Sequence, residues 1–281
     1  MSTFTLLGTG SCEGIPAPFC TCKLCSYARV AGAKERRRRF SLLVDEALQI
    51  DFGPDTADSW RTFNIDETKI RHICITHSHA DHFQPLDLMW RNALTGAPAL
   101  DLAGNAEVLK MYDATFQKEF GHKPEKAINK PIFHDVVPGK TLILGGYKIL
   151  AVRASHMKFE NDAVNYLVTT PQGRKLLILA DTGWWCQESF DLVKGEMADA
   201  VVVELSCGTH PGEDIKKEHH LGAQAAMEFI NELKAQNSVK PDAICVTTHV
   251  SHVPQTTQKE LEEYFKDTFI TAGYDGLKVE F

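Results

Sequence analysis

The chain has 281 residues, of which 43% are hydrophobic and 24% are charged, and its formal net charge is −7. Such a chain is long enough for a large buried core, and its negative charge disfavours an extended nucleic acid as partner. It contains no apolar run of membrane-spanning length, no linker rich in Pro, Gly or Ser, and no internal repeat, so we expect no membrane partner.

The N-terminal segment carries a cluster of three of the eight cysteines, Cys20, Cys22 and Cys25. No basic and apolar leader precedes the cluster, so we expect a cytoplasmic protein, in which clustered thiols are typical of metal sites rather than disulfides. Three thiolates need one more ligand to complete a zinc tetrahedron, and His252 is the best candidate. The alternative is that these thiols are reactive or simply buried. The other five cysteines stand singly and are expected to be packing residues.

A run of four arginines, Arg36–Arg39, precedes the strand predicted over 40–44. Such runs are most often solvated faces. The alternative is that one guanidinium contacts a substrate phosphate or a partner chain.

The most informative segment is His77-Ser-His79-Ala-Asp81-His82, which follows the apolar alternation of residues 70–76. The alternation predicts a short buried strand, so the motif lies at the end of that strand and in the next loop. Neutral imidazoles and carboxylates are ligands that suit zinc, manganese or iron. Four such groups within six residues predict a metal site.

Three later apolar strands each end on a further candidate ligand: His156, Asp181 and His249. Strands that finish on polar side chains build a site at one edge of a layered α/β fold. With the motif, this makes five histidines and two aspartates. That number exceeds the need of one tetrahedral ion and matches two ions a few Å apart. Because these ligands must converge, we expect a single domain over residues 1–281.

Two helices are predicted between and after these strands, over 107–120 and from Ala223 to Leu233. His219 and His220 stand just before the second helix and are not needed to complete the ligand set. Trp184 and Trp185 follow Asp181, and we favour core packing over a role in lining a pocket.

The order of these ligands resembles that of the metallo-β-lactamase superfamily over nearly the whole chain. The resemblance implies an α/β fold, an αββα sandwich with a dinuclear centre. His77, His79 and His156 would bind one metal, Asp81, His82 and His249 the other, and Asp181 would bridge them. Asp51, at the end of a strand over 48–50, would orient the histidine loop without binding metal.

The glycines of Gly8-Thr-Gly10 and Gly14-Ile-Pro16, the cysteine cluster and Thr248-His249-Val-Ser-His252 are similar to the PhnP-type branch of that superfamily. This branch implies a phosphodiesterase that opens small cyclic phosphates, phosphoribosyl 1,2-cyclic phosphate-like, by means of a metal-bridging hydroxide. It also implies a structural zinc held by an N-terminal loop at about residues 12–30. The two catalytic divalent metals would be manganese or zinc, with iron and nickel as further candidates.

The same resemblance implies that a histidine before the later helix protonates the leaving oxygen. His220 aligns best with that position, His219 is the alternative, and Asp81 is counted with His220 among the catalytic residues. The expected partner is a small phosphorylated substrate, and a homodimer is left open. Two other functions are also left open: hydrolysis of another substrate, such as a cyclic nucleotide or another phosphodiester, and a PqqB-like accessory role in cofactor biosynthesis.

Overall fold

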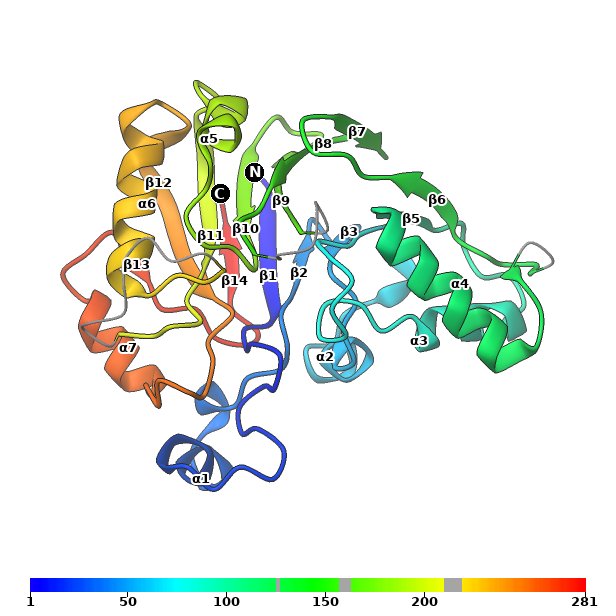
Figure 1. Ribbon diagram of the computed structural model, residues 1–281, viewed down its shortest axis with the longest axis horizontal. Helices are drawn as coiled ribbons and strands as arrows, with labels where there is room; N and C mark the ends of the chain where they lie inside the picture. The colour runs from blue at the N-terminus through cyan, green and yellow to red at the C-terminus, as the bar shows by residue number, and fades with distance from the viewer. Residues whose placement is uncertain (125–126, 157–162, 210–218) are drawn as a thin grey trace.

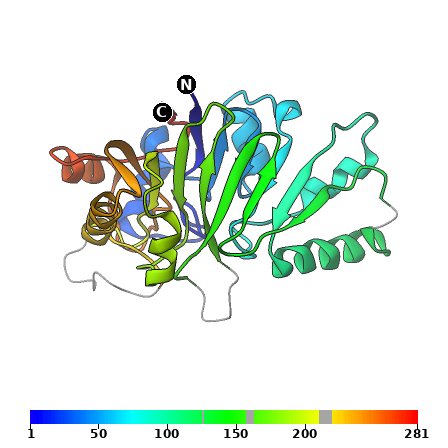
Figure 2. The ribbon, with the colours of Figure 1, turned by 90° about the horizontal axis from the view of Figure 1, so that it is seen from above.

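The computed structural model describes residues 1–124, 127–156, 163–209 and 219–281. Two seven-stranded sheets pack face to face, and helices cover their outer faces (Figures 1 and 2). The expected αββα sandwich is therefore confirmed. Within the described ranges, no helix is both long and apolar enough to cross a bilayer.

The first sheet has the strand order β14-β1-β2-β3-β4-β5-β6. Strands β14, β1, β2 and β3 pair antiparallel, whereas β3 to β6 run parallel. The bounds are β1 (Thr3–Gly8), β2 (Ser41–Val44), β3 (Leu48–Ile50), β4 (His72–Cys74), β5 (Asp101–Gly104), β6 (Ile132–Asp135) and β14 (Lys278–Glu280).

The second sheet has the order β13-β12-β11-β10-β9-β8-β7. Strands β7 to β10 pair antiparallel, and β10 to β13 run parallel. The bounds are β7 (Thr141–Leu144), β8 (Tyr147–Arg153), β9 (Val164–Thr169), β10 (Lys175–Leu179), β11 (Ala198–Glu204), β12 (Val239–Thr248) and β13 (Ile270–Thr271). All seven residues of β11 are buried, as expected of a parallel strand covered on both faces.

Helices lie on both sides of the sandwich, and local sequence signals mark the ends of some of them. For example, Asn105 caps the longest helix by accepting hydrogen bonds from two amides of its first turn, and Gly121, with φ 71°, ends it. The bounds are α1 (Lys23–Val30), α2 (Thr56–Thr62), α3 (Leu86–Met89), α4 (Ala106–Phe120), α5 (Gln187–Val193), α6 (Ala223–Ala235) and α7 (Gln258–Phe265), with the 3₁₀ turns η1 (Ala33–Glu35), η2 (Glu67–Lys69) and η3 (Trp90–Ala93).

Three apolar clusters hold these layers together. One lies between the sheets and includes Leu6, Ile50, Tyr166 and Val202. The other two pack the outer helices against the first sheet and against the second. Trp185 belongs to the cluster of the second sheet, where its indole donates a hydrogen bond to the Asn165 side chain, as the packing interpretation predicts.

The arginine run differs from its expected solvated face. Arg37 is only 4% exposed, and its guanidinium donates hydrogen bonds to the Thr9 hydroxyl at 2.8 Å and the Gly273 carbonyl at 2.9 Å. Arg39 donates from Nη1 to both carboxylate oxygens of Asp55, each at 2.9 Å. The solvated-face interpretation is therefore wrong for Arg37, because a run of like charges does not reveal which side chains point inward to carbonyls.

Candidate metal centres

The candidate ligands converge because four strands end at the same edge of the sandwich. His77 follows β4, His156 follows β8, Asp181 follows β10 and His249 follows β12. The first of these strands belongs to one sheet and the other three belong to the second sheet. The structure therefore brings together the side chains that the strand-end pattern singles out.

His77, His79, His156 and Asp181 form the first cluster, and one ligand atom from each lies within 4.8 Å of every other. His79 Nδ1 is 3.0 Å from His77 Nε2 and 3.4 Å from His156 Nε2. His156 Nε2 is also 3.3 Å from Asp181 Oδ2. Three imidazole nitrogens and a carboxylate oxygen thus face a common point.

Asp81, His82, Asp181 and His249 form the second cluster with the same spacing. Here the other oxygen of Asp181 is used: Oδ1 is 2.6 Å from His249 Nε2 and 3.3 Å from His82 Nε2. His82 Nε2 is also 3.2 Å from Asp81 Oδ2. Because its two oxygens face different clusters, Asp181 is placed to bridge two cations.

The charge and burial of this centre fit divalent cations. Asp181 Oδ1 is buried and makes no hydrogen bond of good geometry within the described residues, although two imidazole nitrogens lie close to it. Such an oxygen is suited to face a cation. Burial alone would raise the pKa of Asp181, but His249 and His82 hold it well below its usual value. The carboxylate therefore stays ionised, as a metal ligand must be.

Residues behind the ligands fix their orientation. Asp51 is fully buried and lies 2.6 Å from His82 Nδ1, and it accepts a hydrogen bond from the Thr76 amide at 2.7 Å. This contact leaves Nε2 of His82 to face the cluster. The structure therefore places Asp51 where an orienting group is expected. Ser206, which the sequence analysis missed, has its hydroxyl 2.8 Å from His249 Nδ1.

His220 lies beside the two clusters, with its ring centroid 4.9 Å from that of His156. Its Nδ1 is 3.0 Å from Oε1 of Glu204, a fully buried residue at the end of β11. Burial alone would lower the pKa of His220, but the Glu204 charge raises it. Sequence reasoning missed Glu204, whose signal was a charge directly after the apolar residues 200–203.

His219 is arranged differently from His220. Its amide donates a hydrogen bond to the Ser155 carbonyl at 2.9 Å, and its ring nitrogen Nδ1 contacts the main-chain carbonyl of His156. Nδ1 of His219 thus contacts a main-chain carbonyl, whereas Nδ1 of His220 contacts the carboxylate of Glu204. The two histidines before α6 therefore differ in the group that their Nδ1 atoms contact.

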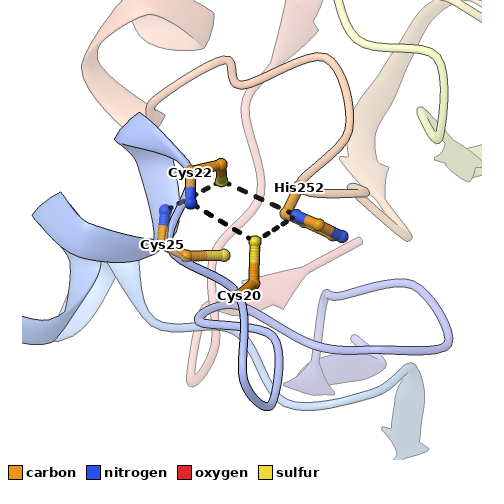
Figure 3. Close-up of side chains that lie close together, drawn as sticks. All are labelled: Cys20, Cys22, Cys25 and His252. Atoms are coloured by element: carbon orange, nitrogen blue, oxygen red, sulfur yellow. Dashed lines mark hydrogen bonds between the residues drawn. The ribbon is translucent and has the colours of Figure 1, made fainter.

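A separate cluster comprises Cys20, Cys22, Cys25 and His252, which point toward one another (Figure 3). The loop before α1 and the first turn of α1 supply the thiols, and the loop after β12 supplies the imidazole. His252 Nδ1 is 3.4 Å from Cys20 Sγ and 3.7 Å from Cys22 Sγ. Three sulfurs and one nitrogen are the donor set of a structural zinc site.

The thiol pKa values show why a cation suits this cluster. Burial alone would raise the pKa of Cys22, but hydrogen bonds from His252 and the Cys25 amide lower it to about 6. Burial raises the pKa of Cys25 to about 12. Without a cation, the neighbouring thiols cannot all ionise together near neutral pH, whereas zinc would stabilise three thiolates.

The five remaining cysteines do not share one environment. Cys74 and Cys245 are buried, as expected of packing residues, but Cys12 and Cys186 are exposed. The packing prediction is therefore wrong for these two. Cys12 lies in a turn after β1 and Cys186 stands directly before α5, and an isolated cysteine gives no sign of its burial.

An αββα sandwich with His and Asp clusters at its strand ends defines the metallo-β-lactamase class of folds. Residues 48–240 match the model of the beta-lactamase superfamily domain, and the chain belongs to this family. No curated protein sequence matches the chain.

Several solved structures share the fold over nearly the whole chain. A diphosphatase of the PhnP family has a TM-score of 0.73 at 24% identity, covering 100% of this chain and 98% of that one. Zinc-bound PqqB from Methylobacterium extorquens has a TM-score of 0.75 at 13% identity, covering 99% and 100%. The short form of human tRNase Z has a TM-score of 0.66 at 18% identity, covering 99% and 98%. At these identities the similarity establishes the fold alone.

Proposed function

We propose that this chain is a metal-dependent phosphodiesterase that hydrolyses a small cyclic phosphate diester of the phosphoribosyl 1,2-cyclic phosphate type. Membership of the superfamily supports the broader class of metal-dependent hydrolases. The similarity to a PhnP-family diphosphatase supports phosphate chemistry. The proposal rests on one observation: the two oxygens of Asp181 face two ligand clusters, and the His220–Glu204 pair lies beside these clusters.

The ligand clusters would hold two divalent cations, manganese or zinc in the first instance. When bound, such cations supply the Lewis acidity that activates water and neutralises phosphate oxygens. Asp51 and Ser206 keep His82 and His249 oriented toward the cations. The site is thereby ordered before substrate arrives, as electrostatic stabilisation of a transition state requires.

His220 would supply the proton that the departing alkoxide needs. Glu204 lies at its Nδ1, which leaves Nε2 as the donating atom. The carboxylate also raises the pKa of His220, which favours the protonated imidazole that a proton donor needs. An alkoxide is a poor leaving group, and this step is therefore where the pair matters most.

Two other functions remain as alternatives. Hydrolysis of a cyclic nucleotide or another phosphodiester would use the same groups with a different substrate pocket. An accessory role in cofactor biosynthesis is supported by the similarity to PqqB. A binding protein, however, has no need of an acid–carboxylate pair beside two metal sites, so we favour hydrolysis.

The test is a substrate panel with the metal-loaded full-length protein. The panel contains cyclic ribose phosphates, cyclic nucleotides, diphosphates and bis-aryl phosphate esters, and Asp181→Ala is the control. We expect the highest kcat/KM with cyclic ribose phosphates and none above background in the variant. A preference for cyclic nucleotides or diphosphates would replace the proposed substrate. Turnover indistinguishable from that of Asp181→Ala throughout the panel would contradict a phosphodiesterase.

A further inference from the structure

Glu13 contacts the loop that joins His249 to the cysteine cluster. Its Oε1 is 3.3 Å from Nε2 of His252, the ring nitrogen on the far side from the thiols. The same oxygen accepts a hydrogen bond from the Ser251 hydroxyl at 2.7 Å. One carboxylate thus contacts two neighbouring residues of the loop that begins at His249.

The segment that carries Glu13 is tied to this loop by backbone hydrogen bonds. The Val250 amide donates to the Thr9 carbonyl at 2.8 Å, and the Ser11 amide donates to the Val250 carbonyl at 3.1 Å. Val250 directly follows His249, which has a left-handed φ of 54°. The segment is therefore hydrogen-bonded to a loop that begins at His249, in the second His/Asp cluster, and continues to His252, in the cysteine cluster.

We propose that Glu13 is a positioning residue that couples the structural zinc site to the His249 arm of the catalytic centre. A carboxylate on the outer nitrogen of a metal-binding imidazole fixes its tautomer and makes the inner nitrogen a stronger ligand. Through Ser251, the same carboxylate holds the adjoining backbone. The inference rests on the proposed zinc site, but it does not depend on which substrate the enzyme hydrolyses.

The first measurement is zinc release from the full-length protein to a coloured chelator. Removing such a partner usually weakens metal affinity by roughly 10–100-fold, so we expect Glu13→Ala to release zinc faster than the wild type by a similar factor. Glu13→Gln keeps an acceptor oxygen and should recover part of the difference. Glu196→Ala, which removes a partly buried carboxylate paired with Lys175, is the matched control and should not change the rate.

The second measurement is manganese binding, followed by the resonance of free Mn²⁺ so that no turnover is needed. Glu13→Ala should weaken the binding of one manganese ion in zinc-loaded protein. In a Cys22→Ser background, which removes the zinc, Glu13→Ala should add no further loss. This pattern separates coupling through zinc from a general loosening of the loop.

Three results would overturn the inference. They are an unchanged zinc release rate in Glu13→Ala, equal losses of manganese affinity with and without zinc, and wild-type protein that binds no zinc. The last result would remove the zinc site but leave the proposed hydrolase activity to its own substrate panel. If Cys22→Ser does not fold, zinc-depleted wild type and zinc-depleted Glu13→Ala replace it in the manganese comparison.

Discussion

The Glu204–His220 pair makes a quantitative prediction about leaving groups. The perturbation is Glu204→Gln, which preserves shape but removes the charge 3.0 Å from His220 Nδ1. A hydrogen bond to a charged group contributes about 1.5–3 kcal/mol and a neutral one about 0.5–1.5 kcal/mol, so the replacement should cost about 1–1.5 kcal/mol in the transition state. That loss corresponds to a decrease of roughly 5- to 13-fold in kcat.

His220→Ala removes the proton donor itself and should cost roughly 10²–10⁴-fold, the usual share of general acid catalysis. Because Glu204 acts through His220, the double variant should be no slower than His220→Ala alone. Both single variants should lose much less with nitrophenyl esters, whose leaving groups depart without protonation. Manganese content should stay unchanged in His220→Ala, because this residue is outside the proposed ligand set.

The assay compares kcat for alkyl and nitrophenyl esters across the wild type, the two single variants and the double variant. Losses that multiply in the double variant would refute the claim that Glu204 works through His220. An equal loss for both ester classes would mean that His220 binds phosphate or metal and donates no proton. If His219→Ala shows the leaving-group dependence and His220→Ala does not, the proton donor is the other histidine of the pair.

Three further perturbations address the metal sites and the sandwich. Asp181→Ala should abolish turnover and lower the manganese content measured by elemental analysis, because it removes the carboxylate that faces both ligand clusters. Asp191→Ala, at an exposed aspartate, is the control. Full activity in Asp181→Ala, or an equal loss in the control, would contradict a dinuclear site. Cys22→Ser should lose zinc and have a lower thermal midpoint, whereas Cys186→Ser, at an exposed cysteine, should change neither. An unchanged zinc stoichiometry in Cys22→Ser would refute zinc binding by this cluster. Asp101→Ala should lower the free energy of unfolding, measured in urea, by about 1–2 kcal/mol, because Asp101 lies 2.7 Å from both His72 and His134. The control is Glu46→Ala, which removes an exposed partner of Lys69. An equally small change in both variants would show that the Asp101 contacts contribute little to stability.

Strand-end patterning predicted the convergence of the ligands because that information is local. Each strand ends on its ligand within the same short segment, and the layered fold brings the strand ends to one edge. Helix α4 was predicted to begin at Glu107 and begins at Ala106, one residue from the Asn105 cap. Helix α6 begins at Ala223 as predicted but runs to Ala235.

Other features depend on contacts between segments far apart in the chain. Glu204 is 16 residues from His220, and Glu13 is 238 residues from Ser251. The hydrophobic pattern of the sequence does not predict such contacts, because they depend on the path of the chain between the two residues. The burial of Arg37 is similar: its partners Thr9 and Gly273 are 28 and 236 residues away along the chain.

The division of ligands between the two sheets has a consequence for how the layers stay together. The loop after β4 in one sheet carries His77, His79, Asp81 and His82, and strands of the other sheet lead to His156, Asp181 and His249. Neither layer supplies all the ligands of either cluster, so each cation would bind fully only when the two layers are packed together. Ligands that bind only the assembled state add their binding free energy to its stability. Divalent cations would then add to the stability of the joined layers, beside the apolar cluster that packs between the two sheets.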